Sequence, residues 1–168
     1  MPNTQEKEIK LVSTTAGREK LFQLPLFQDT VIAGSRHTLK LVNRYFDTQD
    51  RRLTKAGMAY RIRETNGQEL EATVKTRGKT VNGFSLRGEY TQPLTVAEPV
   101  LAGFAPAIDQ HLRELLARAA LEPLFTVNVT RELALLQVSP ATVVELSVDR
   151  GGISADGKQA PIMKSNWN

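Results

Sequence analysis

The stretch EKEIKLV, residues 6–12, has charged residues at alternate positions. Because successive side chains of a β-strand point to opposite faces, Glu6, Glu8 and Lys10 are predicted to share one face, with Lys7, Ile9 and Leu11 on the other. Two carboxylates and an ammonium group would then lie side by side on one face of a sheet. Such a face needs a partner of opposite or mixed charge.

Further alternating segments predict an antiparallel β architecture. Asn66-Gly67 and Asn82-Gly83 between them are typical of tight hairpin turns. Helical patterns are fewer, and one of them is closed by Gly57. The alternating segments are 38–48, 58–65, 69–77, 84–94, 124–138 and 142–154, and the helical ones are 13–24, 50–57 and 105–121. The sequence therefore predicts an α+β fold, mainly antiparallel β, in a single domain over residues 1–168.

Charged residues recur two positions apart along nearly every predicted strand. Two structures explain this recurrence. The charges line the solvated face of a one-sided sheet, or they line the interior of a closed or nearly closed barrel in which anions and cations fill the space. The repetition on strand after strand favours the barrel. The charged residues concerned are Arg61, Arg63, Lys75, Arg77, Arg87, Glu89, Arg131, Glu145 and Asp149, and Ser147 shares the face of the last two.

The chemistry of these side chains matches a phosphate and a metal ion together. Guanidinium and ammonium groups bind phosphate oxygens, whereas clustered carboxylates suit Mg²⁺ or Mn²⁺. The net charge of +4 favours an anionic partner. Aromatic residues make up 6% of the chain and do not alternate with the basic residues, which argues against nucleic acid as the partner.

Composition limits the remaining classes of protein. The chain has 168 residues, of which 40% are hydrophobic, and no apolar run is long enough to span a membrane. It contains no cysteine, which excludes disulfides and cysteine nucleophiles. We expect a cytoplasmic protein with no membrane partner.

The ordered set of segments resembles the CYTH superfamily, the triphosphate tunnel metalloenzymes. EKEIKL fits the Glu-x-Glu-x-Lys signature of that family, which by itself is short. The segments that follow stand in the family's order, so the resemblance extends over nearly the whole chain. They are RYFDTQDRRLTKAGMAYRIRE, ATVKTRG, SLRGEY, NVTRE and VVELSVDRGGI.

The resemblance implies a tunnel of antiparallel strands with helices packed outside and a divalent cofactor, Mg²⁺ or Mn²⁺. It assigns two sets of residues. The cations that would contact a triphosphate and support its reaction are Lys10, Arg61, Arg63, Lys75 and Arg131, with Arg77 and Arg87 as further substrate contacts. The carboxylates that would bind the metal are Glu6, Glu8, Glu145 and Asp149, whereas Arg87 and Glu89 would pair with each other.

The same resemblance leaves three functions open. The first is metal-dependent hydrolysis of a triphosphate, with inorganic triphosphate favoured. The second is an adenylyl cyclase that converts ATP to cyclic AMP. The third is a noncatalytic module that binds polyphosphate or a nucleotide.

The last residues depart from the family. An acidic strand of the form E-I-E-L-E is expected, but the chain reads MKSNWN at 163–168. A shifted reading frame of suitable Met-Lys-Ser-Asn-Trp-Asn codons encodes that acidic strand, so we hypothesise a frameshift, which DNA sequencing tests. We expect a domain truncated at this end, an open sheet edge that favours a homodimer, and poor turnover.

Overall fold

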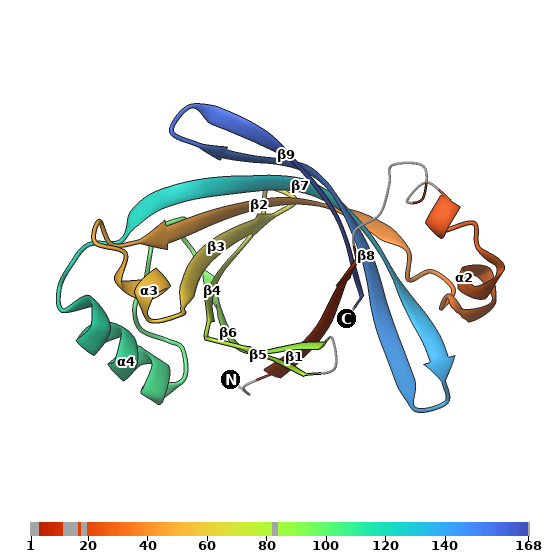
Figure 1. Cartoon of the computed structure of the whole chain (residues 1–168), viewed down its shortest axis with the longest axis horizontal. Helices are drawn as coiled ribbons and strands as arrows, with labels where there is room; N and C mark the ends of the chain where they lie inside the picture. Colours follow the sequence, from red (N-terminus) through yellow and green to blue (C-terminus); the bar gives the residue numbers. More distant parts are fainter. Residues whose placement is uncertain (1–3, 12–16, 18–19, 82–83, 168) are drawn as a thin grey trace.

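The computed structural model describes residues 4–11, 17, 20–81 and 84–167, with side chains for 17, 20–78 and 88–162. These residues form one antiparallel sheet and short helices (Figure 1). The strands are β1 (Thr4–Leu11), β2 (His37–Asp47), β3 (Ala59–Thr65), β4 (Glu69–Lys75), β5 (Lys79–Val81), β6 (Phe84–Leu94), β7 (Glu122–Ser139), β8 (Thr142–Ala155) and β9 (Lys158–Trp167). The helices are α2 (Pro25–Thr30), α3 (Arg52–Lys55) and α4 (Pro106–Leu116).

The strand order within the nine-stranded sheet is β1-β9-β8-β7-β2-β3-β4-β6-β5. β1 pairs with β6 as well as with β9, so it connects two parts of the sheet that lie far apart in this order. Figure 1 shows a strongly curved sheet, with α3 and α4 outside β2 and β3 and with α2 on the opposite side of the molecule. The predicted antiparallel architecture with few helices is confirmed.

Several predicted boundaries agree with the structure. The segment 84–94 is strand β6, and the turn at Asn66-Gly67 has both residues at positive φ, 53° and 71°, as a tight hairpin requires. Asn82-Gly83 and most of the predicted helix 13–24 lie outside the described residues. The predicted helix 105–121 is too long: α4 ends at Leu116, because Ala117 adopts a left-handed conformation with φ 45°.

The C-terminal segment corrects one expectation. Residues Lys158–Trp167 form β9, which pairs with β8 along its length and with β1 at Ser165, Asn166 and Trp167. The expected open edge beside β8 is therefore wrong, and the expected dimer loses its basis. Backbone groups make these pairings, so a strand can form here without the acidic sequence that the family led us to expect.

The two faces of the sheet have opposite character. On the outer face of β3 and β4, Tyr60, Ile62 and Val74 are buried, together with Leu53 of α3 and Leu112 of α4. A second apolar cluster packs Phe22 and Phe27 against β7 and β8. Each such buried side chain contributes about 1.5–3 kcal/mol of hydrophobic stabilisation. The intervening residues of the same strands therefore lie on the inner face.

Asp47, at the end of β2, fixes the start of α3. Its side chain is almost fully buried and accepts four hydrogen bonds from Thr48, Leu53 and Thr54, with lengths of 2.7–3.0 Å. Burial favours the neutral acid, but the hydrogen bonds to the carboxylate outweigh that effect and lower the pKa of Asp47 below its ordinary value. The helix that leads into β3 thus depends on an ionised carboxylate.

Replacing Asp47 with Asn should lower the free energy of unfolding by about 2–3 kcal/mol at pH 7, because the charge and one acceptor oxygen are lost. A depressed carboxyl pKa stabilises the fold above about pH 4 and loses this effect as the pH falls through the folded-state value. The difference in urea unfolding between D47N and wild type should therefore be smaller at an acidic pH below the folded-state pKa of Asp47 than at pH 7. The exposed D29N is the matched control, and an equal loss at both pH values would contradict the assignment.

Candidate functional site

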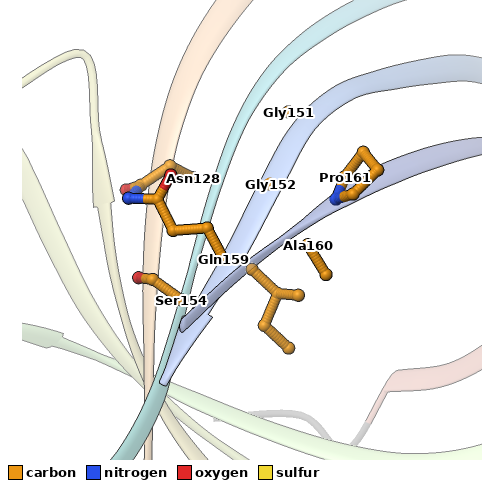
Figure 2. A pocket seen from close by; sticks show the side chains of 8 residues that line it. Asn128, Gly151, Gly152, Ser154, Gln159, Ala160 and Pro161 are labelled. Atoms are coloured by element: carbon orange, nitrogen blue, oxygen red, sulfur yellow. The ribbon is translucent and has the colours of Figure 1, made fainter. Parts of the chain in front are cut away.

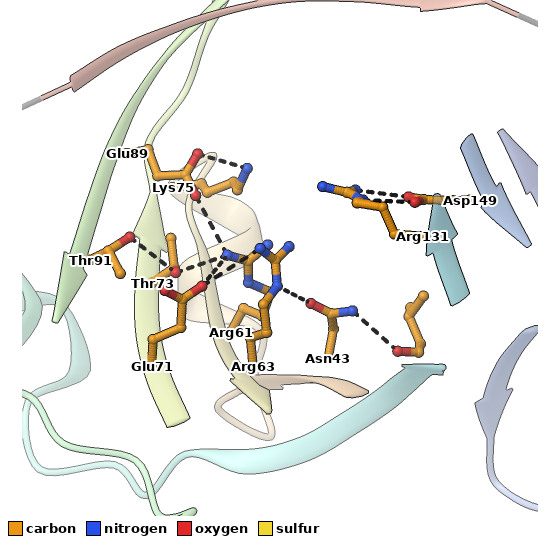
Figure 3. Close-up of polar contacts among 11 residues, drawn as sticks. Asn43, Arg61, Arg63, Glu71, Thr73, Lys75, Glu89, Thr91, Arg131 and Asp149 are labelled. Carbon is orange, nitrogen blue, oxygen red and sulfur yellow. Dashed lines mark hydrogen bonds and ion pairs between the residues drawn. The ribbon is translucent and has the colours of Figure 1, made fainter. Parts of the chain in front are cut away.

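Arg61 occupies the centre of a charged cluster on the inner face of β3, β4 and β6 (Figure 3). The residue is only 4% exposed. Its Nη2 donates to Thr73 Oγ1 at 2.9 Å and lies 3.5 Å from a carboxylate oxygen of Glu71 and of Glu89. Thr73 Oγ1 in turn bonds Thr91 Oγ1 at 3.2 Å. Two neighbouring strands therefore hold this one guanidinium group.

Arg63 lies two residues farther along β3 and is oriented by an amide. Its Nε donates to Asn43 Oδ1 at 2.8 Å, and its Nη1 is 3.6 Å from Glu71 Oε1. Asn43 is itself buried and donates through Nδ2 to the backbone oxygen of Val127 at 3.3 Å. Glu71 thus lies between both arginines, and Asn43 connects Arg63 to β7.

Two further cations complete the cluster. Lys75 Nζ is 3.0 Å from Glu89 Oε2. Arg131 of β7 makes a bidentate pair with Asp149 of β8, with Nε and Nη2 at 2.7 and 2.8 Å from the two carboxylate oxygens. Figure 3 shows this pair across from Lys75, Arg61 and Arg63. The inner face therefore gathers four cations from β3, β4 and β7.

The cations also repel one another. Burial, together with the charges of Arg61 and Arg131, lowers the pKa of the Arg63 guanidinium to about 10, against the opposing effects of Glu71 and Tyr45. A lowered arginine pKa means that the surroundings disfavour the charged form. Additional negative charge beside Arg63 would relieve this cost.

Two polar atoms on this face have no hydrogen-bond partner within the described part of the chain. They are Arg61 Nε and Ser147 Oγ, and both are buried. Arg44 Nη1, on the opposite face, is the third such atom. A buried donor without an acceptor is costly, and on the charged face a bound anion would supply the missing contact. The Arg61 guanidinium is thus only partly satisfied by the protein itself.

The predicted site residues divide into three groups. The structure brings Arg61, Arg63, Lys75, Arg131 and Asp149 together, as Figure 3 shows. Glu145 is half-buried on β8, four residues from Asp149. Arg77 follows the end of β4 and is exposed. Its side chain lies against Gly57: a Cβ atom added to that glycine would be 3.2 Å from the Cβ of Arg77.

The third group lies outside the described side chains and is placed by its backbone alone. Glu6 and Glu8 of β1 are in register with Arg87 and Ser85 of β6. Lys10 is in register with Asn166 of β9.

Sequence reasoning missed four residues of the cluster. They are Asn43, Glu71, Thr73 and Thr91. Glu71 and Thr73 share the alternation of Lys75 on the same strand, and this signal was available in the sequence. Asn43 and Thr91 are uncharged, so charge patterning could not find them.

The described carboxylates of the cluster form only part of a metal site. Among the side chains that the structure describes, no group of three or more His, Asp or Glu residues is placed to hold a metal ion. Both oxygens of Asp149 accept hydrogen bonds from Arg131. The predicted donor set therefore fits a divalent cation only in part. Of its two carboxylates with described side chains, Asp149 is held in a bidentate pair and Glu145 is not. Glu6 and Glu8 are placed by their backbone alone.

A separate hollow of about 440 Å³ lies beside the glycine pair of β8 (Figure 2). Its polar side chains are Asn128, Ser154 and Gln159, and none of its lining residues is charged. Gly151 is required here, because a Cβ would lie 1.9 Å from the backbone oxygen of Asn128. The uncharged lining does not match a polyanion, so the cationic cluster remains the candidate site.

The sequence matches a known family model. The model of the CYTH domain matches residues 4–157. This chain belongs to the CYTH family. An inorganic triphosphatase from Haemophilus influenzae is 34% identical over 163 residues, which cover 94% of this CYTH chain but 43% of that protein. The chain thus spans less than half the length of this relative.

Solved structures agree with the CYTH fold. A putative adenylate cyclase from Bacillus halodurans superposes with a TM-score of 0.60 and 21% identity, covering 99% of this chain and 81% of that one. A putative adenylyl cyclase from Hippeastrum, described as having a dominant triphosphatase activity, gives 0.57 and 16%, covering 98% and 78%. At these identities the likeness establishes the fold alone. No helix of the CYTH chain, within its described residues, is long and apolar enough to cross a membrane.

Replacing Arg63 with Gln should raise the free energy of unfolding of the ligand-free protein by about 1 kcal/mol at pH 7.5, because one of the mutually repelling cations is removed. A basic group with a lowered folded-state pKa costs stability while it is charged, and this cost begins to fall only as the pH rises above about 10, toward the higher unfolded-state value. Urea unfolding in buffer without multivalent anions measures the effect. R44Q, on the opposite face of the sheet, is the control, and a loss of stability specific to R63Q would contradict the repulsion.

Proposed function

We propose that this CYTH domain hydrolyses a phosphoanhydride bond of a triphosphate, with inorganic triphosphate as the preferred substrate. The observation that carries the proposal is the buried positive charge: Arg63 has a pKa lowered to about 10, and the buried Nε of Arg61 has no acceptor among the described residues. A polyanion would satisfy both. The similarity to an inorganic triphosphatase supports the same substrate class.

The cations are proposed to bind the phosphates by exchanging partners. Without a ligand, Glu71 and Glu89 neutralise Arg61, Arg63 and Lys75. Phosphate oxygens take over some of these contacts when a triphosphate binds, since guanidinium groups donate hydrogen bonds to carboxylate and phosphate in the same bidentate geometry. Lys10 and Arg131 are proposed as further contacts, together with Arg87, and Arg77 would act only at the margin of the site.

The curved sheet is proposed to act as a closed tunnel around the substrate. The pairing of β1 with both β9 and β6 supports this closure. A closed interior limits solvent access, which strengthens electrostatic interactions between the cations and the phosphoryl oxygens. Strand β1 also carries Glu6, Glu8 and Lys10, so the strand that would close the tunnel would also complete its charged lining.

A divalent metal, Mg²⁺ or Mn²⁺, is proposed as the cofactor. Glu6, Glu8 and Glu145 would hold it, with Asp149 available only if its pair with Arg131 opens. When bound, the metal would neutralise phosphate charge and orient a water molecule for attack. The protein's own part is to fix the triphosphate and to offset the charge that develops on the phosphoryl oxygens, which requires no side-chain nucleophile.

Wild-type protein should release phosphate from inorganic triphosphate slowly in the presence of Mg²⁺ or Mn²⁺, because β9 lacks the expected acidic residues. Replacing Arg61 with Gln should lower kcat/KM about a hundredfold, because a preorganised donor to the phosphoryl oxygens is removed. R44Q again serves as the control with an equal loss of charge. Cyclic AMP formed from ATP in place of phosphate would support a cyclase and overturn the proposal, and tight binding without turnover of any triphosphate would support a binding module.

Positions 164 and 166 of β9 provide a test of the metal site. They are in register with Asp149 and Ser147, on the acidic strand β8. Residues directly opposite one another in an antiparallel pair lie on the same face, so carboxylates introduced there would add to the proposed metal shell. The double variant K164E/N166E should lower the half-saturating Mn²⁺ concentration for phosphate release about tenfold.

The matched control for this variant is M163E/S165E. It adds the same two charges at positions in register with Arg150 and Val148, on the other face of β8. Equal responses of the two double variants would show that the register does not define the metal site.

A further inference from the structure

Asn43 of β2 is an uncharged residue within the cationic cluster, and it contacts the strands on both sides of it. It is 5% exposed and stands in register with Arg63 of β3 and with Val127 of β7. Its Oδ1 accepts a hydrogen bond from Arg63 Nε at 2.8 Å, and its Nδ2 donates to the backbone oxygen of Val127 at 3.3 Å. Figure 3 shows the two bonds on either side of the amide group. The side chain of Asn43 thus bridges β3 and β7.

The orientation of this amide is determined by its two partners. Arg63 Nε can only donate a hydrogen bond, and the carbonyl oxygen of Val127 can only accept one. Exchanging the oxygen and nitrogen of Asn43 would place a donor against a donor and an acceptor against an acceptor, and both contacts would be lost. The amide oxygen is therefore directed at Arg63.

The bond from Nε decides which part of the Arg63 guanidinium can face a ligand. A guanidinium binds a planar or tetrahedral anion either through Nε and one terminal nitrogen or through both terminal nitrogens. In the described part of the chain, Nη1 and Nη2 make no hydrogen bond, and Nη1 lies 3.6 Å from Glu71 Oε1. Because Asn43 occupies Nε, the pair of terminal nitrogens remains for a phosphate.

The acceptor that orients Arg63 is neutral. Arg131, in contrast, is held by the carboxylate of Asp149, with oxygens 2.7 and 2.8 Å from its nitrogens. A carboxylate at hydrogen-bond distance neutralises its guanidinium partner, whereas an amide oxygen fixes the group and leaves its charge uncompensated. An aspartate in place of Asn43 would also put a carboxylate oxygen against the backbone oxygen of Val127. An amide is thus the group that orients Arg63 without competing with an anion.

We infer that Asn43 is a positioning residue for substrate binding: it directs both terminal nitrogens of Arg63 toward a phosphate and leaves the charge of Arg63 available. This inference rests on the proposed function, in which Arg63 contacts the triphosphate. Asn43 acts through Arg63 and not by touching the substrate. An acidic replacement of Asn43 should therefore impair binding more than a small apolar replacement does.

Calorimetry measures the dissociation constant of inorganic triphosphate in buffer without divalent metal ions, so that the cations alone are compared. N43A should weaken binding about tenfold, because Arg63 loses the bond that orients it. N43D should weaken binding about a hundredfold, because a carboxylate pairs with Arg63 and repels the phosphate. The matched control is N128D, which adds the same charge at an exposed position beside the separate hollow. It should leave the constant within about twofold of wild type, because exposed charges are screened.

Urea unfolding separates a role through Arg63 from a role in strand packing alone. N43D keeps an acceptor for Arg63 Nε, so it should be at least as stable as N43A while it binds triphosphate more weakly. If packing of β2 were the whole effect, the less stable variant would also be the weaker binder, and that result would overturn the inference. N43S, whose hydroxyl can still donate a hydrogen bond, replaces N43A if that variant does not fold.

A double-mutant cycle with R63Q provides a second test. In the R63Q background, N43A should change the dissociation constant by no more than about twofold, because the residue through which Asn43 acts has been removed. Additive effects of N43A and R63Q would overturn the inference.

These outcomes are distinct from failure of the proposed function. Triphosphate binding without phosphate release, with N43D as the weaker binder, would overturn the proposed hydrolysis and support the positioning role of Asn43. Failure of the wild type to bind triphosphate would overturn both.

Discussion

Arg61 carries a charge that is buried within the sheet, and much of the site follows from neutralising it. An isolated charge in a protein interior costs several kcal/mol even after relaxation, so its partners must be built into the fold. Here Glu71 and Thr73 come from β4 and Glu89 from β6. Because these partners lie on neighbouring strands, the pairing of β3 with β4 and of β4 with β6 has to be maintained for Arg61 to keep them. Within the described part of the chain, the Nε of Arg61 has no acceptor.

The outer face of the same strands enforces this pairing. Tyr60 and Ile62 alternate with Arg61 and Arg63 along β3, and both apolar side chains are fully buried under α3 and α4. A slip of one residue would place guanidinium groups in the apolar cluster and expose the aromatic and aliphatic side chains. The hydrophobic core therefore fixes which side of the sheet receives the charges. Asp47 adds to this by holding α3 in position immediately before β3.

The cations and the acidic residues of the site differ in how firmly they are held by their partners. Arg61, Arg63 and Lys75 share two carboxylates, so a polyanion can replace these partners at moderate cost. Asp149, in contrast, is only 7% exposed and is held by two short hydrogen bonds from Arg131. Among the described side chains, the proposed phosphate contacts are thus better prepared than Asp149 is as a proposed metal ligand. The relatives share the fold and the chain spans less than half of the triphosphatase that it resembles, so the activity itself has to be measured on this chain.

The sequence by itself determined the faces of the strands and the family. Alternation in residues 61–63 and 84–94 predicted both the strands and the inner position of the cations, and local chemistry predicted the turn at Asn66-Gly67. Only the tertiary structure decided which charges pair. It assigned Asp149 to Arg131, left Arg77 outside the cluster, and added β9 where an open edge was expected. The reason is physical: alternation is a property of one strand, whereas ion pairs and edge pairing depend on register between strands that are distant in the chain.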